Sequence, residues 1–548
     1  MAVAPTPVAA APDAPDRAQR ATFSARATAF FDWIKNTFVA GVNALASNVY
    51  ANAQDAASSA ANAVAQSASA TAQAGIATAQ AAAATSAAAT ATTQAGVATT
   101  QAASITTAAA TSTAKADVAT AKAAEATAAA ATATAIVLGV ATGYPIIRPS
   151  LTLDFANSQI FDPRITFTRA SAATRVNSMG LIETVASGVP RLTFAALTGA
   201  CEGYLVEEQR TNMCTWSDSP RTAMSPWKCA LIETMVLAPD GVCVANKLVE
   251  DTSSNTHNAS VSLSVTAGTT YTFSAFVKAG ERTSASVALN AHNGAFAFTE
   301  ISVNLETGEC AVLAGSPVSY GAVPFKSGWW RAHITGTAIA TAAGIPSVGA
   351  RSTSSSYTGD GTSGIYLWGT QHEPGSFPTS YIRSGGAATT RAADVAVMTG
   401  VDFASWYRQD EGTFVVNGKC SQPVPAAQYP RLLQVGTSSA NTMAVLFDGG
   451  SWLYASSVFG GAEVFNAGAT RTATVDNRVS MAYKRDDYAL SINGGVAAAD
   501  TTGDVPTVTR LAVGLDYGAW GFFNGTISDL TYYPLRLTNA ELQALSAQ

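Results

Sequence analysis

Charged and aromatic residues are nearly missing from one long stretch of the sequence. Between Ala51 and Ala135 five side chains are charged and none is aromatic, so this stretch cannot supply the core of a globular domain. Hydrophobic runs are short as well, because the most apolar one, Ala135–Ala141, falls far short of a bilayer span. The N-terminus has no basic segment followed by an apolar one. We therefore expect no signal peptide and no membrane insertion.

Signatures of metal binding, redox chemistry and nucleic-acid binding are also lacking. The six cysteines form no CxxC pair and are widely spaced, which favours buried free thiols over disulfides. The histidines His257, His292, His333 and His372 have no metal-ligand spacing. A net charge of −6, with no basic run, argues against nucleic acid as a partner. We expect no cofactor.

Motifs of nucleophilic and metal-dependent catalysis are missing, since no GxSxG, HExxH or P-loop pattern occurs. The adjacent glutamates Glu207 and Glu208 would point to opposite faces of a strand, so they cannot flank one glycosidic bond. A surface or structural pairing with Arg210 is the better interpretation. The sequence therefore predicts a protein that is not an enzyme. Because glycosidase carboxylates leave little trace in a sequence, a polysaccharide-depolymerising enzyme stays the alternative.

What the sequence does contain is a 21-residue unit repeated three times, at 71–91, 92–112 and 113–133. Threonine opens every seven residues from Thr71 to Thr134, and small residues recur at alternating spacings of three and four. This pattern is typical of a coiled coil with alanine at the contact positions. We predict a helical coiled-coil stalk over 51–143, in which roughly 85 helical residues would give a rod of about 130 Å. A disordered low-complexity linker is the alternative.

The N-terminal segment, residues 1–50, is predicted to be helical over 16–50 and flexible before that. Five of its apolar residues recur at helical spacing: Phe23, Phe30, Ile34, Phe38 and Leu45. A short helix with such an apolar face has to bury it against a sister chain or a docking partner. Two compatible interpretations remain, an ordinary helical hairpin or bundle segment and an anchor that attaches the stalk to a larger assembly.

After Pro145 the pattern changes to short alternating segments separated by turns. Strands are expected in five of them: 271–281, 301–309, 443–450, 488–495 and 525–534. Asn493-Gly494 is a strong hairpin signal. Without helical patterns between them, such strands indicate all-β sandwiches rather than βαβ units.

Two further signals divide and terminate the β-rich part. The small, polar stretch 384–396 predicts a boundary between two modules, 144–396 and 397–548. Near the C-terminus, Thr538 and Glu541 have the spacing of a helix capping box. The fold class expected for the chain is thus an N-terminal α-helical stalk followed by two all-β sandwiches.

Several of the β-rich segments resemble modules of tailed-bacteriophage proteins. LTLDFANSQIFDPRITFTRASAATRVNSMGLIETVASGVPRLTF (151–194) and GYLVEEQRTNMCTWS (203–217) resemble the opening of a module of phage fibres and head spikes. GIYLWGTQHEPGSFPTSYIRSGGAATTRAADV (364–395) continues that module, which is similar to carbohydrate-binding-module jelly rolls. Residues 401–548 resemble a concanavalin A-like (laminin-G-like) domain in EGTFVVNG, YALSINGG and GTISDLTYYPLRLTNAELQAL.

This resemblance implies homotrimeric virion fibres and glycan recognition, and it supplies no agreed set of catalytic residues. We expect a tail fibre or head spike on the virion surface, assembled in the host cytoplasm. Its N-terminus would bind a portal, neck, tail or capsid protein, and its β-modules would bind host-surface polysaccharide for adsorption. A purely structural decoration fibre is a further alternative.

Large aromatic residues are the expected means of sugar binding, because their faces stack on sugar rings. Trp329, Trp330 and Trp368 lie in strand-like runs, so we expect them in the core. The candidate glycan-binding residues follow turns or lie in a glycine-rich loop: Trp452, Tyr454, Tyr517 and Trp520. Packing between subunits of a trimer is the alternative for these four.

Three aspartates in turn sequences, Asp360, Asp448 and Asp516, could hold a structural calcium ion. A plain turn is the better interpretation for each of them.

Overall fold

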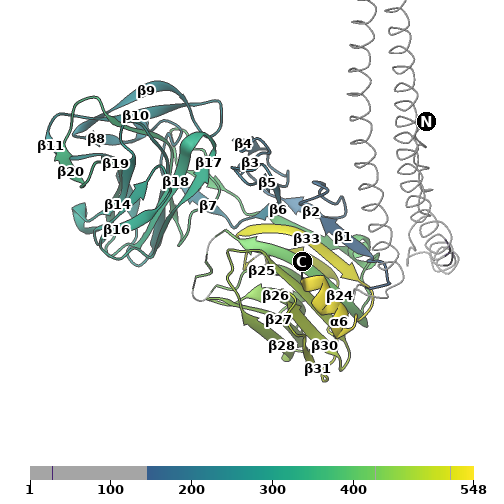
Figure 1. Cartoon of the computed structure of the whole chain (residues 1–548). Coiled ribbons are helices and arrows are strands. Elements are labelled where there is room, and N and C mark those ends of the chain that lie inside the picture. The colour runs from purple at the N-terminus through teal and green to yellow at the C-terminus, as the bar shows by residue number, and fades with distance from the viewer. Residues whose placement is uncertain are drawn as a thin grey trace, which may run out of the picture. The chain divides into compact units, whose positions relative to one another are not determined.

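The structure is a computed structural model (Figure 1). It describes residues 145–547 except 422, 426, 427 and 519, together with Thr28 and Asp32. The predicted N-terminal helix, with its face of Phe23, Phe30, Ile34, Phe38 and Leu45, and the predicted stalk over 51–143 lie outside the described residues. None of the described helices is long and apolar enough to cross a membrane. The account below concerns the unit from Ile147 to Gln548.

The described chain forms all-β sandwiches, as the strand patterns predict. One of them, here named the split sandwich, has a first sheet in the order β31–β30–β29–β24–β33–β6–β5, with β1 also paired to β33. Its strands are β1 (Leu151–Asp154), β5 (Leu192–Phe194), β6 (Cys201–Val206), β24 (Glu411–Cys420), β29 (Asn477–Lys484), β30 (Tyr488–Ile492), β31 (Ala498–Asp500) and β33 (Gly525–Tyr533).

The second sheet of the split sandwich has the order β2–β23–β32–β25–β26–β27–β28. Its strands are β2 (Thr166–Thr168), β23 (Val395–Thr399), β32 (Arg510–Val513), β25 (Arg431–Ser438), β26 (Asn441–Phe447), β27 (Trp452–Phe459) and β28 (Ala462–Thr470). Inward-facing residues of both sheets, among them Phe414, Val445 and Tyr532, form one buried core. This alternation of core-facing and outward-facing residues along each strand decides which side chains can reach a ligand.

The other sandwich, here named the inserted sandwich, pairs a sheet in the order β17–β18–β13–β21–β10–β9 with one in the order β16–β15–β14–β19–β11–β20. The first sheet contains β9 (Cys229–Leu237), β10 (Val244–Glu250), β13 (Thr270–Ala279), β17 (Ser319–Phe325), β18 (Trp329–Thr337) and β21 (Gly364–Pro374). The second contains β11 (Ser254–Ser260), β14 (Ser284–Asn290), β15 (Thr299–Asn304), β16 (Cys310–Ala314), β19 (Ala342–Arg351) and β20 (Ser356–Thr358), with β8 (Ser225–Trp227) and β12 (Leu263–Val265) at its side. Phe273, Val287 and Leu367 belong to its core.

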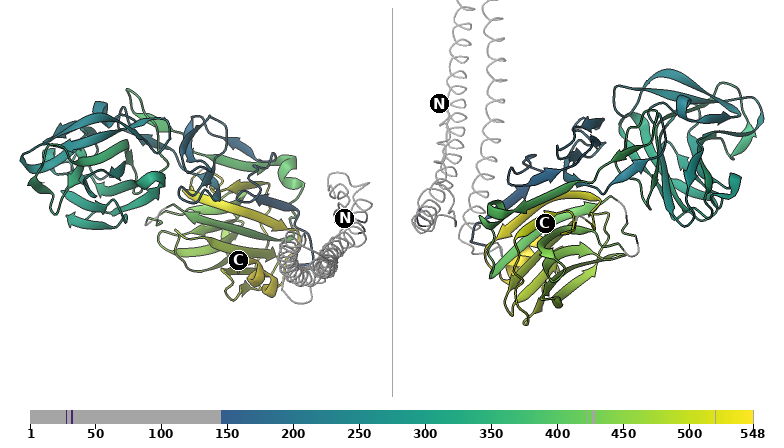
Figure 2. Two further views of the ribbon diagram at one scale, coloured as in Figure 1. Left: turned by 45° about the horizontal axis from the view of Figure 1, so that its top comes forward. Right: turned by 180° about the vertical axis from the view of Figure 1, so that it is seen from behind.

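The sheets divide the chain differently from the predicted modules 144–396 and 397–548. β1 pairs with β33, placing Leu153 opposite Leu530, and β2 pairs with β23. β6 also pairs with β33, so strands from both ends of the described chain share one sheet. In Figure 1 the blue strands β1 and β6 lie beside the yellow strand β33, and Figure 2 shows the same arrangement from two other sides. The C-terminal sandwich therefore needs residues 151–206 as well.

A short two-stranded stem marks where the chain leaves the split sandwich and returns to it. β7 (Arg210–Asn212) pairs with β22 (Thr389–Arg391), with Asn212 opposite Thr389. Everything between these strands, including the inserted sandwich, is an insertion at this stem. The predicted boundary at 384–396 contains β22, the strand of the stem on which the chain returns. Its partner β7 lies far earlier in the sequence, and no local pattern predicts that the two strands pair.

A buried ionic cluster lies next to the stem. Asp394 accepts hydrogen bonds from Arg191 and from Arg169, the latter at 3.0 Å. Glu207 accepts from Arg191 at 2.8 Å and from Arg391 at 2.7 Å. All five side chains are buried, and they come from segments on both sides of the insertion. The cluster therefore holds the leaving and returning chains together.

The electrostatics of this cluster favour the charged form of Glu207. Burial alone would raise the pKa of Glu207, but Arg391, Arg191 and Ser380 lower it to about 2. Ser380 contributes both its backbone N–H, at 2.6 Å, and its hydroxyl, at 2.5 Å. Removing one member of such a cluster leaves a buried charge without compensation.

Several local predictions are confirmed. The five predicted strand segments coincide with β13, β15, β26, β30 and β33. Asn493 and Gly494 both have positive φ, and Gly495 N–H donates to Ile492 C=O at 3.0 Å, as a type I′ hairpin turn requires. Thr538 and Glu541 form a capping box at the start of α6 (Asn539–Ser546).

The predictions of core tryptophans and free thiols hold, but the predicted burial of the thiols holds for only two of the six. Trp329 and Trp368 are fully buried and Trp330 is partly buried against the core. All six cysteines are free thiols, two of them, Cys214 and Cys420, buried. Burial raises the pKa of Cys214 to about 12, so this thiol stays protonated and unreactive at neutral pH.

Candidate functional site

The outer face of the second sheet of the split sandwich carries two of the predicted aromatic residues. Leu453 and Ala455 on β27 point into the core, so their neighbours Trp452 and Tyr454 point outward. Trp452 is 41% exposed, and Tyr454 is partly buried. The sheet position thus presents one edge of an aromatic surface to solvent.

Gly468 on β28 makes room for these two side chains. It pairs with Tyr454, and a Cβ atom at this position would lie 2.4 Å from Cβ of Tyr454 and 2.9 Å from Nε1 of Trp452. Any larger residue would displace both rings. The glycine therefore lets the indole of Trp452 lie across the strand beside Tyr454.

The glycine-rich loop after β32 contributes the most exposed aromatic residue. Trp520 is 74% exposed. Oδ1 of Asp516 accepts hydrogen bonds from the backbone N–H groups of Gly518, at 2.8 Å, and Trp520, at 2.7 Å. The N–H of Asp516 donates to the C=O of Trp520 at 2.9 Å. Asp516 is thereby bonded to both Gly518 and Trp520, and the side chain of Trp520 is left exposed.

This loop closes on the start of β25. The N–H of Arg431 donates to the C=O of Gly521 at 3.0 Å. Gly521 has φ +54, and a Cβ atom there would lie 2.8 Å from the C=O oxygen of Tyr429, so the close approach requires glycine. Tyr429, in the segment before β25, is 49% exposed. Its ring adds a further aromatic side chain to this face.

Arg431 lies at the centre of the arrangement. Its Nη1 donates to the C=O of Tyr429 at 2.8 Å and lies 4.0 Å from Oδ2 of Asp516. Its Nε is buried and has no hydrogen-bond partner among the described residues. Burial lowers the pKa of Arg431, while Asp516, Tyr454 and Tyr517 favour its charged form. Arg431 thus stays a cation with unused donor capacity.

Arg431 and its neighbours line a hollow of about 380 Å³. The size lies within the range of small-ligand sites. Its lining residues are Glu208, Gln428, Tyr429, Pro430, Arg431, Asp516, Trp520, Gly521 and Phe522. We call this hollow, with Trp452 and Tyr454 beside it, the aromatic face. It combines flat apolar rings with a cation and a carboxylate, which is the chemistry that recognises a polyhydroxylated ring.

The structure places all four predicted candidates on or next to this face. Trp520 lines the hollow, and Tyr454 and Tyr517 act electrostatically on Arg431. Trp452 adjoins Tyr454. The C=O of Tyr517 accepts a hydrogen bond from Arg510, so this residue supports the loop while its ring is partly buried. Their role in ligand binding stays a prediction.

Sequence reasoning missed Arg431 and Tyr429. Both lie in the segment Tyr429-Pro430-Arg431, directly before the apolar run that forms β25. The sequence shows only an arginine beside a proline directly before an apolar run, and this does not distinguish Arg431 from other arginines. A sequence cannot show that this segment meets the loop at Asp516, because eight strands, β25 to β32, lie between the two along the chain.

The other candidates have structural roles. Glu208 pairs with Arg210, as predicted, and Glu207 belongs to the buried ionic cluster. Oδ1 of Asp360 accepts from the N–H groups of Thr362 and Ser363, at 2.8 and 2.7 Å, and Asp448 accepts from the N–H of Trp452 at 3.2 Å. The described residues contain no group of three or more His, Cys, Asp or Glu side chains that could hold a metal ion.

Comparisons with known proteins extend to the fold alone. No family model and no curated protein matches the sequence. Among solved structures, the chain is similar to the carbohydrate-binding module CBM40 of a Ruminococcus gnavus sialidase bound to α2,3-sialyllactose. That match has 18% identity and a TM-score of 0.23, and it covers 25% of this chain and 84% of that one.

Two longer matches are weaker in sequence. Domains LG4-5 of the mouse laminin α1 chain match with 9% identity and a TM-score of 0.19, over 50% of this chain and 85% of that one. A sialidase from Trypanosoma rangeli matches with 10% identity and a TM-score of 0.23, over 59% and 62%. Matches with identities and TM-scores this low transfer neither a ligand nor an activity.

Proposed function

We propose that the split sandwich binds carbohydrate through the aromatic face. The observation that carries this proposal is the gap between Arg431 and Asp516, which lie 4.0 Å apart in the hollow that the exposed Trp520 also lines. This distance is too long for a direct hydrogen bond. A sugar hydroxyl in the gap would accept a hydrogen bond from Arg431 and donate one to Asp516. One hydroxyl would thereby satisfy both charged groups.

The aromatic rings would supply the remaining contact area. A sugar ring has an apolar face of C–H groups, which stacks on the flat side chain of Trp or Tyr. Trp520 and Tyr429 border the hollow, and Trp452 and Tyr454 continue the aromatic surface across β27. A single site of this size binds weakly. A chain of sugars can run along the face and contact several rings at once.

We further propose that the chain is a bacteriophage virion fibre, a tail fibre or head spike that adsorbs to the host surface. The supporting observations are in the sequence: the 21-residue repeat and the segments that resemble phage fibre modules. In a homotrimer, three aromatic faces on each fibre would raise the effective affinity for a polysaccharide by about 10²-fold or more through avidity. Adsorption then requires no bond to be broken.

Binding of the full-length protein to an array of bacterial surface polysaccharides tests the carbohydrate proposal. A retained glycan is then measured with Trp520→Ala, which removes the most exposed ring. We expect affinity to fall about tenfold, because stacking on one aromatic ring contributes on the order of 1 kcal/mol or more. Trp227→Ala, at an exposed tryptophan of the inserted sandwich, is the matched control. Equal affinity of the Trp520→Ala variant and the wild type would contradict the proposal.

A fibre role is tested separately, by labelling this protein on the virion and imaging the particle. Attachment at the tail or head, with loss of host adsorption in the Trp520→Ala virion, is the expected result. Normal adsorption of that virion would favour a purely structural decoration fibre. Deleting 397–548 is unsuitable for this purpose, because it would also remove the partner strands of β1 and β6.

One observation favours the alternative of a polysaccharide-depolymerising enzyme. Two carboxylates, Glu208 and Asp516, line the same hollow. Glu208 is paired with Arg210, and Oδ1 of Asp516 is held by two backbone N–H groups. The measurement that decides is the release of new reducing ends from a bound polysaccharide. Sustained release that is lost in both Glu208→Gln and Asp516→Asn would establish the enzyme and contradict simple adsorption.

A further inference from the structure

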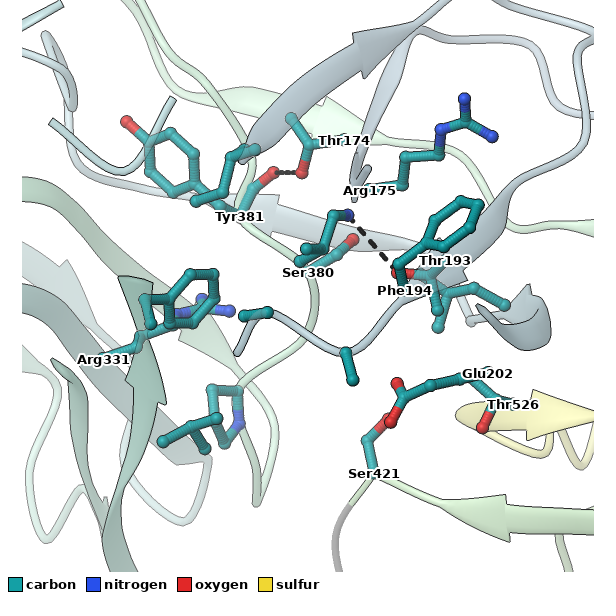
Figure 3. A pocket seen from close by; sticks show the side chains of 18 of the residues that line it. Thr174, Arg175, Thr193, Phe194, Glu202, Arg331, Ser380, Tyr381, Ser421 and Thr526 are labelled. Atoms are coloured by element: carbon teal, nitrogen blue, oxygen red, sulfur yellow. Dashed lines mark hydrogen bonds between the residues drawn. The ribbon is translucent and has the colours of Figure 1, made fainter. Parts of the chain in front are cut away.

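A second cavity, distinct from the aromatic face, lies against β18. It encloses about 580 Å³, a volume within the range of small-molecule sites. Arg331 and His333 line it from β18, and residues of β3 (Ala173–Val176), β5 and the segment 378–381 line other sides. Figure 3 shows Arg331 on one side of the cavity, Glu202 and Ser421 on the other, and Ser380 between them.

His333 is a buried polar side chain that makes no side-chain hydrogen bond to the residues that the structure describes. It is 4% exposed, and neither Nδ1 nor Nε2 has a hydrogen-bond partner among the described residues. Burial, with a contribution from Arg331, lowers the pKa of His333 to about 4. The ring is therefore neutral at physiological pH and offers one N–H donor and one nitrogen acceptor. Buried polar groups without partners are rare in proteins and call for an explanation.

Arg331 lies two residues from His333 on the same strand, so both side chains share one face of the sheet. Its Nη1 donates to the C=O of Thr379 at 2.6 Å, and its Nη2 donates to Ser274 Oγ at 3.1 Å. Its Nε is buried and has no hydrogen-bond partner in the described part of the chain. Within 4.0 Å, no carboxylate of the described residues forms an ion pair with Arg331. Among these residues, the positive charge of Arg331 is thus balanced only by carboxylates at longer distances.

The acidic groups that act on Arg331 over longer distances are Glu373 and Glu207. Oε1 of Glu373 accepts from Gln371 and from the N–H of Thr379, and Oε2 accepts from the hydroxyl of Thr379. Glu207 is held by the ionic cluster and by Ser380. Both carboxylates are thus directed to other partners, and neither forms an ion pair with Arg331 among the described residues. A carboxylate brought by a ligand would fill that position.

We propose that this cavity binds a small carboxylate ligand of the acidic-sugar class. The ligand's carboxylate accepts hydrogen bonds from Nε of Arg331 and from the ring N–H of His333. Charge-assisted bonds of this kind are shorter and stronger than neutral ones, which favours an anion over a neutral analogue.

The walls of the cavity fit the rest of such a ligand. Hydroxyl groups line it at Thr174, Thr193, Ser421 and Thr526, and apolar groups line it at Val323 and Phe325. Figure 3 places Thr193, Ser421 and Thr526 away from Arg331. A sugar acid has this distribution of chemistry, with a charged end, several hydroxyls and an apolar ring face. A fatty acid would leave the hydroxyl groups of the wall without partners.

Binding of D-glucuronate and D-glucose to the full-length protein tests the proposal. The two sugars differ by a carboxylate in place of a hydroxymethyl group. Calorimetry gives the affinities, and the ring signals of the four histidines in a histidine-labelled sample locate the site. We expect glucuronate to bind at least about tenfold more tightly than glucose and to shift the His333 signals. Equal affinities, or glucuronate binding that leaves the His333 signals unchanged, would overturn the proposal.

A pair of matched variants separates binding in this cavity from binding elsewhere. Val323 lines the cavity and is 46% exposed, so Val323→Trp can fill the cavity without disturbing the core. Val318→Trp places the same residue at a position that is 58% exposed and close by in the chain. We expect Val323→Trp to abolish glucuronate binding and Val318→Trp to preserve it. Unchanged binding in Val323→Trp would exclude the cavity, whatever the aromatic face binds.

Discussion

Asp516 and Arg431 lie on opposite sides of a gap on the outer face of the split sandwich, with Oδ2 of Asp516 4.0 Å from Nη1 of Arg431. Oδ1 of the same carboxylate is held by the N–H groups of Gly518 and Trp520. The carboxylate therefore has one oxygen committed to the loop and one directed to the gap. Because the two oxygens have separate roles, the role of Asp516 in binding can be tested without disturbing the loop.

Asp516→Asn should weaken glycan binding while preserving the loop. The amide oxygen can still accept from the two N–H groups, but the amide nitrogen cannot accept a hydrogen bond from a sugar hydroxyl. We expect the affinity for a glycan found by the array to fall about tenfold, as for the loss of a hydrogen bond to a charged group. Titration calorimetry measures this change.

The control for this prediction is Asp500→Asn. Asp500 also accepts from a backbone N–H in a turn, that of Thr502, but it lies outside the hollow. Its variant should bind glycan with the affinity of the wild type. An equal loss in both variants would show that carboxylates in turns act through the fold rather than through the ligand.

The stem formed by β7 and β22 predicts that the inserted sandwich can be removed. Asn212 and Thr389 are paired, and paired residues of antiparallel strands lie about 5 Å apart. Replacing 213–388 by Asn-Gly should therefore close the stem as a hairpin. We expect a folded, soluble protein with cooperative thermal unfolding, at a lower midpoint because Ser380 is lost from Glu207.

The comparison for that deletion is a fragment of residues 397–548, which follows the boundary expected from sequence. It lacks β1 and β6, both partners of β33, and should remain unfolded or insoluble. Near-ultraviolet circular dichroism distinguishes the two proteins. A folded 397–548 fragment would mean that residues 151–206 are dispensable for the sandwich.

Features encoded by neighbouring residues were predictable from the sequence, and features that depend on distant pairing were not. The turn at Asn493-Gly494 and the capping box of Thr538 and Glu541 are decided within a few residues, and both are confirmed. The pairing of Leu153 with Leu530 depends on which strands share a core. Apolar and polar residues alternate along a strand in the same way whichever strand lies beside it, so this pattern does not identify the partner. The division into domains was therefore beyond the local signals.

The candidate site follows the same rule. Trp520 and Trp452 were recognisable because large aromatic residues beside turns and glycines are hard to bury. Arg431 was not recognisable, since a single arginine before an apolar run has no distinguishing pattern. Its importance comes from the loop at Asp516, which reaches it through the bond from Arg431 N–H to Gly521 C=O. Contacts between segments that are distant in the sequence form only in the folded chain, so the sequence pattern does not reveal them.

His372 should make the protein less stable in mild acid. Its ring is stacked on Tyr271 with centroids 5.2 Å apart, and neither ring nitrogen has a hydrogen-bond partner among the described residues. Burial lowers the pKa of His372 from 6.5 to about 3. Below pH 6.5 the unfolded chain binds a proton that the folded chain rejects. The contribution of His372 to the free energy of unfolding therefore falls by about 1.4 kcal/mol per pH unit as the pH decreases from 6.5 to about 3.

Replacement His372→Phe removes this titration and keeps an aromatic ring on Tyr271. We expect the free energy of unfolding, measured with denaturant at each pH, to depend less on pH in this variant. Between pH 6.5 and 4 its slope should be smaller than that of the wild type by about 1.4 kcal/mol per pH unit. His292→Gln, at an exposed position, should leave the slope unchanged. If His372→Phe has the pH dependence of the wild type, the buried ring does not exclude a proton.

Asp394 should be the most sensitive position of the ionic cluster. It accepts hydrogen bonds from Arg169 and Arg191, and both guanidinium groups are fully shielded from solvent. Asp394→Asn keeps the shape of the side chain but leaves a buried positive charge without compensation. We expect a loss of about 3–5 kcal/mol in the free energy of unfolding.

The matched control is Asp410→Asn, which breaks the pair with Arg408 at the surface. Asp410 is exposed, so this change should cost no more than about 1 kcal/mol. Urea denaturation of the full-length variants measures both effects. Because the cluster joins segments on both sides of the insertion, Asp394→Asn should also expose the stem to proteolysis near Arg391. Similar losses in the two variants would mean that solvent reaches the cluster and that the stem is held by its backbone ladder alone.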